Sequence, residues 1–140
     1  MNVPHRAYQQ QSTPNWTRID MLLALLDGTI ERLQSGLAAL HHGETAGARA
    51  QLGRAHVMAL ELAAGINLAV EDPASVNLLR LYEFVAHSTS HSDPIGIETS
   101  INVLKTVRDG FRSIRQEAIE LERSGKLPPP DQPMLVETTA

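Results

Sequence analysis

The chain has 140 residues, a formal net charge of −4 and no cysteine. This length fits one domain with its own core, the acidic balance argues against nucleic acid as a partner, and the absence of cysteine excludes disulfides. The N-terminal residues are polar, and no segment reaches the roughly 20 apolar residues of a membrane-spanning helix, so we expect a soluble cytoplasmic protein with no membrane insertion. Only 4% of residues are aromatic, and the Leu- and Ala-rich remainder favours an all-α fold.

The first predicted elements are a polar arm and a long helix. The arm spans residues 1–15 and contains Pro4 and Pro14. Thr17 suits the N-cap of a helix over residues 18–42, with Asp20 favourably placed in its first turn. Apolar residues recur every three or four positions along this helix: Ile19, Leu22, Leu23, Leu26, Ile30, Leu33, Leu37 and Leu40. The periodicity runs through Asp27-Gly28, so it outweighs the turn signal of that pair.

Three further helices are expected. Gly43 should end the first helix, and the second then covers residues 45–70. Asp72-Pro73 and Asp93-Pro94 each place a capping residue before a proline that suits the first helical turn, so a third helix runs to residue 90 and a fourth to Gly125. The predicted inward residues of these helices are Ala48, Leu52, Ala55, Ala59, Leu62, Ile66 and Ala69; Val76, Leu79, Tyr82, Val85 and Ala86; and Ile97, Ile101, Leu104, Val107, Phe111, Ile114, Ala118 and Leu121.

Four amphipathic helices with short connections pack most simply as an antiparallel four-helix bundle. We therefore expect a helical domain over residues 16–125, preceded by the arm and followed by a Pro-rich tail, residues 126–140, which we expect to be disordered.

Apolar residues also lie beside the predicted buried faces. They are Met21, Leu25 and Gly28 in the first helix, Val57, Leu60 and Ala64 in the second, and Leu81 and Phe84 in the third. A second apolar strip of this kind suits a groove that accepts a partner helix, and a glycine there allows a partner backbone to approach. A broad apolar face that only widens the core is the alternative.

Residues that support catalysis or metal binding are scarce. His87 and His91 are four positions apart and share a helical face, but two ligands do not complete a metal site, and we expect both to face solvent. His41 and His42 suit a helix C-terminus. No phosphate-binding glycine loop or paired nucleophile and base is present, so we expect neither an enzyme nor a cofactor, metal or catalytic site.

One chemical alternative concerns His56. The stretch Arg54 to Leu60 loosely resembles the phosphorylated helix of histidine phosphotransfer domains, which are also helical bundles. Those domains follow the histidine with Lys three positions later and Gly four positions later, where this chain has Ala59 and Leu60. The charge that would neutralise a phosphate is therefore missing, which disfavours this alternative.

A family resemblance covers residues 5–122. Ala7-Tyr8 in the arm, followed by the helical M-L-L-A-L-L-D-G-T-I-E-R-L, resembles the flagellar secretion chaperone family FliS, in which an A-Y arm precedes a helix reading L-I-x-M-L-Y-D-G-A-I-x-x-L. Further along, N-L-L-R-L-Y-E-F at residues 77–84 resembles the family's N-L-x-x-L-Y-x-Y. Leu26, Asn67 and Phe84 replace Tyr, Asp and Tyr of the family pattern, and Thr17-Arg18 replaces Ser-Pro.

The resemblance implies a cytoplasmic chaperone that binds the C-terminal segment of flagellin, prevents its premature polymerisation and assists its delivery to the flagellar export apparatus. It also implies that the arm around Tyr8 covers part of the client surface when no client is bound. We expect partner contacts from Tyr8, Met21, Leu25, Gly28, Leu60, Ala64, Leu81 and Phe84, in a chain that is a monomer or weak homodimer. A generic helical module for some other amphipathic peptide is the alternative.

Overall fold

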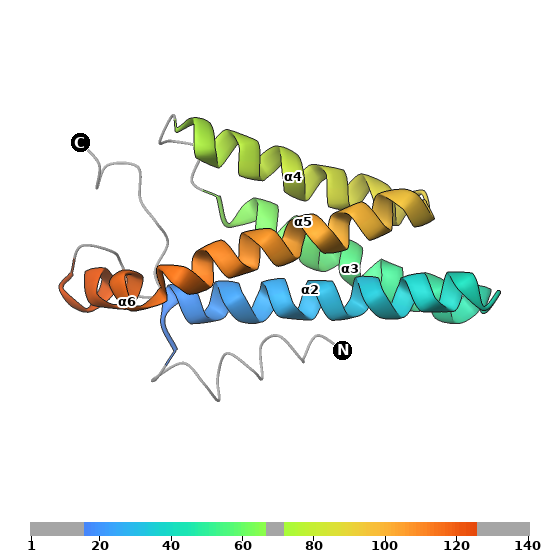
Figure 1. The fold of residues 1–140 in the computed structure, drawn as a ribbon, viewed down its shortest axis with the longest axis horizontal. Helices are drawn as coiled ribbons and strands as arrows, with labels where there is room; N and C mark the ends of the chain where they lie inside the picture. The colour runs from blue at the N-terminus through green and yellow to red at the C-terminus, as the bar shows by residue number, and fades with distance from the viewer. Residues whose placement is uncertain (1–15, 67–71, 126–140) are drawn as a thin grey trace.

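The computed structural model describes residues 16–66 and 72–125, and this part of the chain is helical with no strand (Figure 1). The helices are α2 (Arg18–His41), α3 (Thr45–Ala64), α4 (Pro73–Ser90), α5 (Pro94–Ser113) and α6 (Arg115–Arg123). The all-α prediction is confirmed. The predicted arm with Tyr8, the segment 67–71 and the Pro-rich tail lie outside the described residues.

Each of the four long helices packs against two of the others. α2 contacts α3 and α5, and α4 contacts the same two helices, so α3 occupies one corner of the assembly and α5 the opposite corner. This arrangement is compatible with a four-helix bundle in which sequential helices are neighbours. α6 packs mainly against the beginning of α2.

The predicted capping residues begin three of these helices. The side chain of Thr17 accepts a hydrogen bond from the backbone N–H of Asp20. Asp72 and Asp93 accept from Ala74 and Ile95 in the same way, each before a proline in the first turn. After α2, Gly43 has φ +71°, a left-handed conformation that favours glycine.

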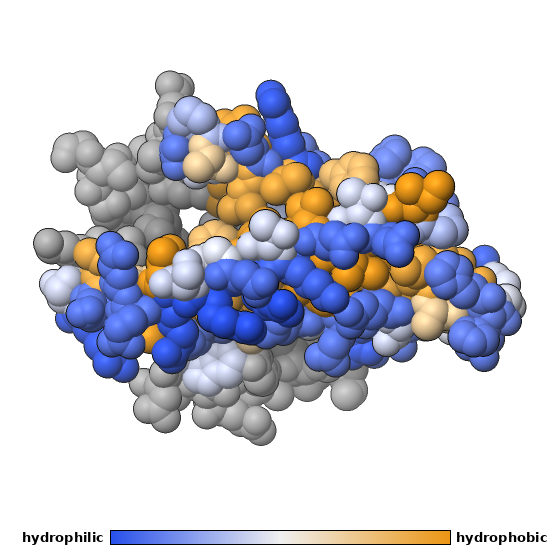
Figure 2. All heavy atoms as spheres, in the orientation of Figure 1, coloured by the Kyte–Doolittle hydropathy of each residue, from blue (hydrophilic) through white to orange (hydrophobic). Residues whose placement is uncertain are grey.

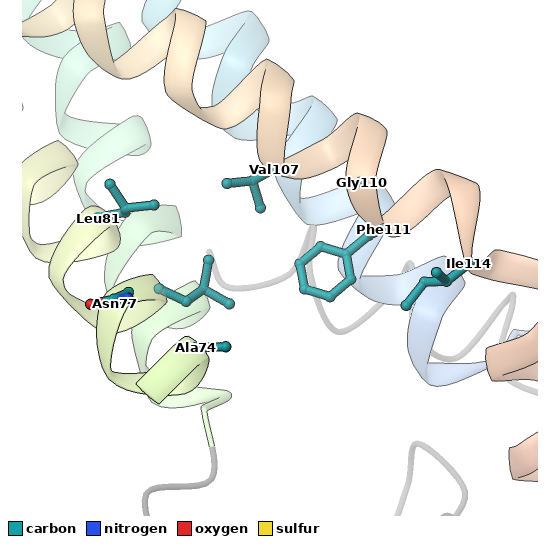
Figure 3. Close-up of a pocket in the computed structure, with 8 residues that line it drawn as sticks. Ala74, Asn77, Leu81, Val107, Gly110, Phe111 and Ile114 are labelled. Atoms are coloured by element: carbon teal, nitrogen blue, oxygen red, sulfur yellow. The ribbon is translucent and has the colours of Figure 1, made fainter. Parts of the chain in front are cut away.

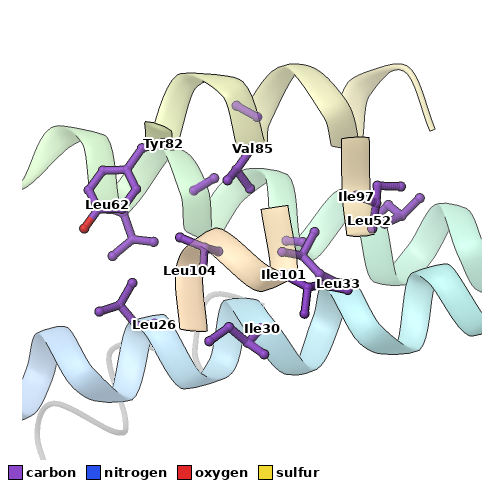
Figure 4. Packing of buried hydrophobic residues seen from close by; sticks show 13 residues of the cluster. Leu26, Ile30, Leu33, Leu52, Leu62, Tyr82, Val85, Ile97, Ile101 and Leu104 are labelled. Carbon is purple, nitrogen blue, oxygen red and sulfur yellow. The ribbon is translucent and has the colours of Figure 1, made fainter. Parts of the chain in front are cut away.

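The core follows most of the predicted apolar stripes (Figure 4). Its buried members are Leu26, Ile30, Leu33, Leu52, Ala55, Ala59, Leu62, Tyr82, Val85, Ala86, Ile97, Ile101 and Leu104. Val76, predicted to face inward, is instead exposed on α4. It lies six residues before Tyr82, the first buried residue of that helix.

The predicted fourth helix is wrong in its second half. The helix is interrupted at Ile114, which has φ −108° and ψ 12°. This residue ends α5, and α6 begins at the next residue. The break resets the phase of the apolar stripe, so Ile119 is buried while Ile114 and Leu121 are exposed. The second predicted helix is also shorter than expected within the described residues, because α3 ends at Ala64 with Gly65 as its cap.

A small second cluster holds α6 in place. Ile119 packs against Ile19 and Leu23 of α2. The guanidinium of Arg115 donates hydrogen bonds to both carboxylate oxygens of Asp20, at 2.6 and 3.2 Å, and the backbone N–H of Arg18 donates to Glu122 at 2.8 Å. This hydrogen bonding holds the pKa of Asp20 below its ordinary value, Arg115 being the largest cause. The short helix is thus tied to the start of α2 by both apolar and ionic contacts.

Candidate functional site

Among the described residues, an apolar groove lies between α4 and α5. The two helices meet closely at the turn that joins them, because a Cβ atom added to Gly96 would lie 2.5 Å from Oγ of Ser88. From this turn the helices diverge toward the start of α4 and the end of α5 (Figure 1). Their separation leaves a groove of about 450 Å³ at the open end, lined by Ala74, Asn77, Leu78, Leu81, Val107, Gly110, Phe111 and Ile114.

The groove lining is almost entirely apolar. Its floor is formed by Leu78, Val107 and Phe111, which also pack against the main core. Leu81 lies on the α4 side and Ile114 on the α5 side, and the Phe111 ring extends from α5 toward α4 (Figure 3). Apolar surface gathers along the junction of α4 and α5, and the surface is hollowed where they diverge (Figure 2). This groove suits the apolar face of a partner helix, and its lining supplies no titratable group for chemistry.

Gly110 is the most informative residue of the groove. A Cβ atom added to it would meet nothing within 4 Å, so the packing of the described chain does not require a glycine there. A glycine in a helix interior costs about 1 kcal/mol relative to alanine. A reason for retaining it is the close approach of another backbone to α5 at this point.

The other side of α5 is polar, and ion pairs join it to α2. Arg108 donates a 3.2 Å hydrogen bond to Asp27, and Arg112 forms an ion pair with the same carboxylate at 3.6 Å. Asp109, and secondarily Asp27, raise the pKa of Arg108 above its ordinary range. Asp27 therefore joins α2 to α5. These pairs fix the position of α5 and leave its apolar side to form the groove wall.

The predicted contact residues lie on three different surfaces. Leu81 lines the α4–α5 groove, and Phe84 is exposed one turn further along α4. Leu60 and Ala64 are exposed on the outer face of α3, where the side chain of Leu60 is 50% accessible.

Three more predicted residues lie on α2. Met21 and Leu25 are half-buried, and Leu25 packs against the main core. Gly28 accommodates a neighbour within the chain, because a Cβ atom added there would lie 2.6 Å from Cε of Met58 in α3. The space beside this glycine is therefore occupied by Met58 of the same chain. Tyr8 lies outside the described residues.

Three groove residues on α5, and Ile114 at its C-cap, were not predicted as contact residues. The sequence predicts that Val107, Phe111 and Ile114 face the core, and it predicts no role for Gly110. The available signal was Gly110, a mid-helix glycine on an apolar side of its helix. The sequence does not reveal that α4 and α5 diverge, and this divergence converts core-facing residues into a groove lining.

Comparison with known protein families shows the family to which this chain belongs. The sequence profile of the family described as flagellar protein FliS matches residues 1–118, most of the chain. The chain belongs to the FliS family. A search of curated proteins returned no match. FliS proteins are flagellar chaperones and the family is not an enzyme family, so a partner from the flagellar system follows from membership.

The histidines of this FliS chain form no reactive or metal-binding cluster in the part that the structure describes. His56 is half-buried, and its Nδ1 lies 3.0 Å from both the carbonyl oxygen of Ala86 and Oγ1 of Thr89. His87 and His91 are exposed, as predicted, with ring centroids 4.1 Å apart. Among residues 16–66 and 72–125 no group of three His, Cys, Asp or Glu could hold a metal ion. Within the same ranges no helix is long and apolar enough to cross a membrane.

Proposed function

We propose that this FliS protein is a cytoplasmic export chaperone that binds the C-terminal segment of flagellin as a helix in the α4–α5 groove. Membership of the FliS family supports the flagellar role. The observation that carries the location is the apolar groove with Gly110 in its wall. Bound in this way, the client segment is withheld from polymerisation until it is delivered to the export apparatus.

The groove supplies the driving force for ordering the client. Leu81, Val107, Phe111 and Ile114 offer apolar surface that an amphipathic helix covers with residues at positions i, i+3, i+4 and i+7. Burial contributes about 25 cal/mol per Å², and the client loses chain entropy on ordering, so an interface of roughly 1,000 Å² or more is needed. Because the groove is short, the client extends beyond it, over the neighbouring exposed ring of Phe84.

Gly110 provides the sharpest test. Gly110→Leu places a side chain at the groove wall, and its Cβ atom meets no atom of the described chain within 4 Å, so we expect the fold to be retained and the helix propensity to improve. Isothermal titration with about 40 C-terminal residues of the cognate flagellin, long enough to span the helices at about 1.5 Å per residue, should show affinity reduced roughly tenfold or more.

A matched control exists on α3. Gly53 also has nothing within 4 Å of an added Cβ, but it lies on the outer face of α3. Gly53→Leu should leave flagellin affinity unchanged. Equal affinities for the wild type and Gly110→Leu, with the fold intact by circular dichroism, would reject the groove as the client site.

The contributions of α2 and the arm are tested separately. Leu25→Asp, assayed by flagellin pull-down, tests the surface that holds Met21, Leu25 and Gly28; an intact fold with unchanged binding removes that surface from the proposal. We also propose that the arm around Tyr8 covers part of the client surface in the free protein. Deletion of residues 1–12 should then alter client affinity, and an unaltered affinity counts against this role.

A further inference from the structure

The outer face of α3 carries an uncharged stripe with the spacing of a coiled-coil seam. Its residues alternate four and three positions apart, as the a and d positions of a heptad do. They are Ala46, Ala50, Gly53, Val57, Leu60 and Ala64. All six are exposed, and the larger two, Val57 and Leu60, keep 55% and 50% of their surface accessible. We call these six residues the α3 stripe.

Within the described ranges, the α3 stripe takes no part in the buried core. α3 packs on α2 and α4 through its other side, where Ala48, Leu52, Ala55, Ala59 and Leu62 are buried. α3 also stands at a corner of the four long helices, where it contacts α2 and α4. The stripe therefore lies on the side of α3 that faces away from both neighbours. Gly53, in the middle of the stripe, has nothing within 4 Å of an added Cβ. A glycine at this position costs helix stability without relieving any contact in the described chain.

The sizes of the side chains point to the occupant. The half of the stripe near the start of α3 has only Ala46, Ala50 and Gly53, whereas the other half has Val57 and Leu60. If a second α3 lies antiparallel, related by a two-fold axis near residue 55, Gly53 opposes Val57 and Ala50 opposes Leu60. Val57 and Leu60 then each meet a small residue, and Ala46 opposes Ala64 at the two ends. A two-fold interface requires this kind of self-complementarity.

A parallel pair lacks this match. In parallel register each seam residue opposes its own copy, so Leu60 meets Leu60 while Gly53 meets Gly53. One half of the interface is then crowded and the other half is empty, and neither packs to the density of a protein interior. The distribution of side-chain sizes along α3 therefore selects the antiparallel arrangement.

We propose that the α3 stripe is a self-association surface, through which two copies of this chain pair their α3 helices antiparallel around residue 55. The stripe extends over residues 46–64, about 27 Å of helix at about 1.5 Å per residue. One pair of helices is a small interface, below the roughly 1,200 Å² of stable complexes. The dimer is therefore reversible and forms as the protein concentration rises. This surface lies on a different helix from the α4–α5 groove.

Sedimentation velocity of the full chain over roughly 1 to 500 μM tests the pairing. The average mass should rise from 15.3 kDa toward twice that value. Leu60→Asp places a charge in the seam, and Gly53→Leu removes the space opposite Val57. Both should raise the concentration at half-association roughly tenfold or more. Ile95→Asp, which changes an exposed residue on α5, and Gly110→Leu should leave it unchanged.

Cross-linking tests the direction, because the chain has no cysteine of its own. In the antiparallel register Ala46 lies opposite Ala64 of the second copy and far from the second Ala46. A mixture of the Ala46→Cys variant and a tagged Ala64→Cys variant should therefore yield a mixed disulfide-linked dimer on oxidation. Ala46→Cys alone should remain monomeric on a non-reducing gel.

Three results would overturn the proposal. They are a mass that stays at 15.3 kDa at the highest concentration, equal weakening by Leu60→Asp and Ile95→Asp, and efficient cross-linking of Ala46→Cys to itself. A monomeric wild type whose client binding is lost in Leu60→Asp would assign the stripe to the client instead. Because Gly110→Leu tests client binding and Gly53→Leu tests self-association, failure of one proposal is distinguishable from failure of the other.

Discussion

Gly36 of α2 and Leu52 of α3 mark a point of close helix approach in the described chain. A Cβ atom added to Gly36 would lie 2.5 Å from Cδ2 and 2.7 Å from Cγ of Leu52, a side chain that is itself buried. Gly28 makes a similar approach to Met58, but there the nearest atom is the end of a flexible side chain. The two glycines therefore differ in how much the neighbour can yield.

Gly36→Ala should destabilise the protein by about 1–3 kcal/mol, because the added methyl group displaces Leu52 within a close-packed core. Urea unfolding followed by circular dichroism measures the change. Gly110→Ala is the matched control, since its methyl group meets nothing and the better helix former should stabilise the protein by about 0.5–1 kcal/mol. Equal unfolding midpoints for the two variants would contradict the close approach of α2 and α3.

Tyr82→Phe should leave stability at neutral pH unchanged or raise it by about 1 kcal/mol. Oη of Tyr82 is buried and has no hydrogen-bond partner in the described part of the chain, and the side chain is only 1% exposed. Removing an unpaired buried hydroxyl removes its desolvation penalty. Thermal unfolding of the two proteins at pH 7 compares them. A loss of several kcal/mol in the variant would show that the hydroxyl has a partner.

The same pair of proteins should differ in alkaline solution. Burial raises the pKa of Tyr82 to about 12 from an ordinary 10.0, so between these values the unfolded chain releases this proton and the folded chain retains it. The wild type therefore loses stability as pH rises from 10 to 12, by roughly 2–3 kcal/mol at the upper end. Tyr82→Phe lacks this loss. The measurement is the unfolding midpoint of each protein from pH 10 to 12. A difference between the two midpoints that does not change with pH would contradict the raised pKa of Tyr82.

Asp20→Asn should loosen α6. The variant loses the ion pair with Arg115, the contact that lowers the pKa of Asp20 most. A lowered folded-state pKa contributes stability above the ordinary value of 3.8, and the contribution is lost as pH falls through that value and below it. Amide hydrogen exchange in α6 should be faster in the variant at neutral pH, and the two proteins should converge in acid. Identical exchange at neutral pH would show that the pair does not hold α6.

Ile119→Ala should release α6 without unfolding the four long helices. Ile119 is the buried residue of α6, and its contacts are with Ile19 and Leu23 of α2. Removing the side chain costs about 2–5 kcal/mol where the site stays intact, but a nine-residue helix unfolds locally instead. Far-UV circular dichroism should show a small loss of helix, with the main unfolding transition retained. Leu121→Ala, which changes an exposed residue of the same helix, should show neither effect.

The sequence by itself determined the helices and most of their inward faces. Local chemistry sets these features: Thr17, Asp72 and Asp93 cap helices wherever those helices pack, and Gly43 adopts a left-handed conformation that other residues avoid. The same residue order identified the FliS family, which the family profile confirmed. The break at Ile114 escaped prediction because no glycine or proline marks it.

Only the tertiary structure decided what the remaining apolar residues do. Periodicity places Val107 and Phe111 on the same face as Leu104, yet Leu104 is buried and the other two floor a groove, because α4 and α5 diverge beyond the turn that joins them. Gly28 and Gly110 have the same local setting, a glycine within an apolar helix. Met58 fills the space beside Gly28, while the space beside Gly110 stays open. Whether a helix face is covered depends on the distance and angle between helices far apart in sequence, which no local pattern encodes.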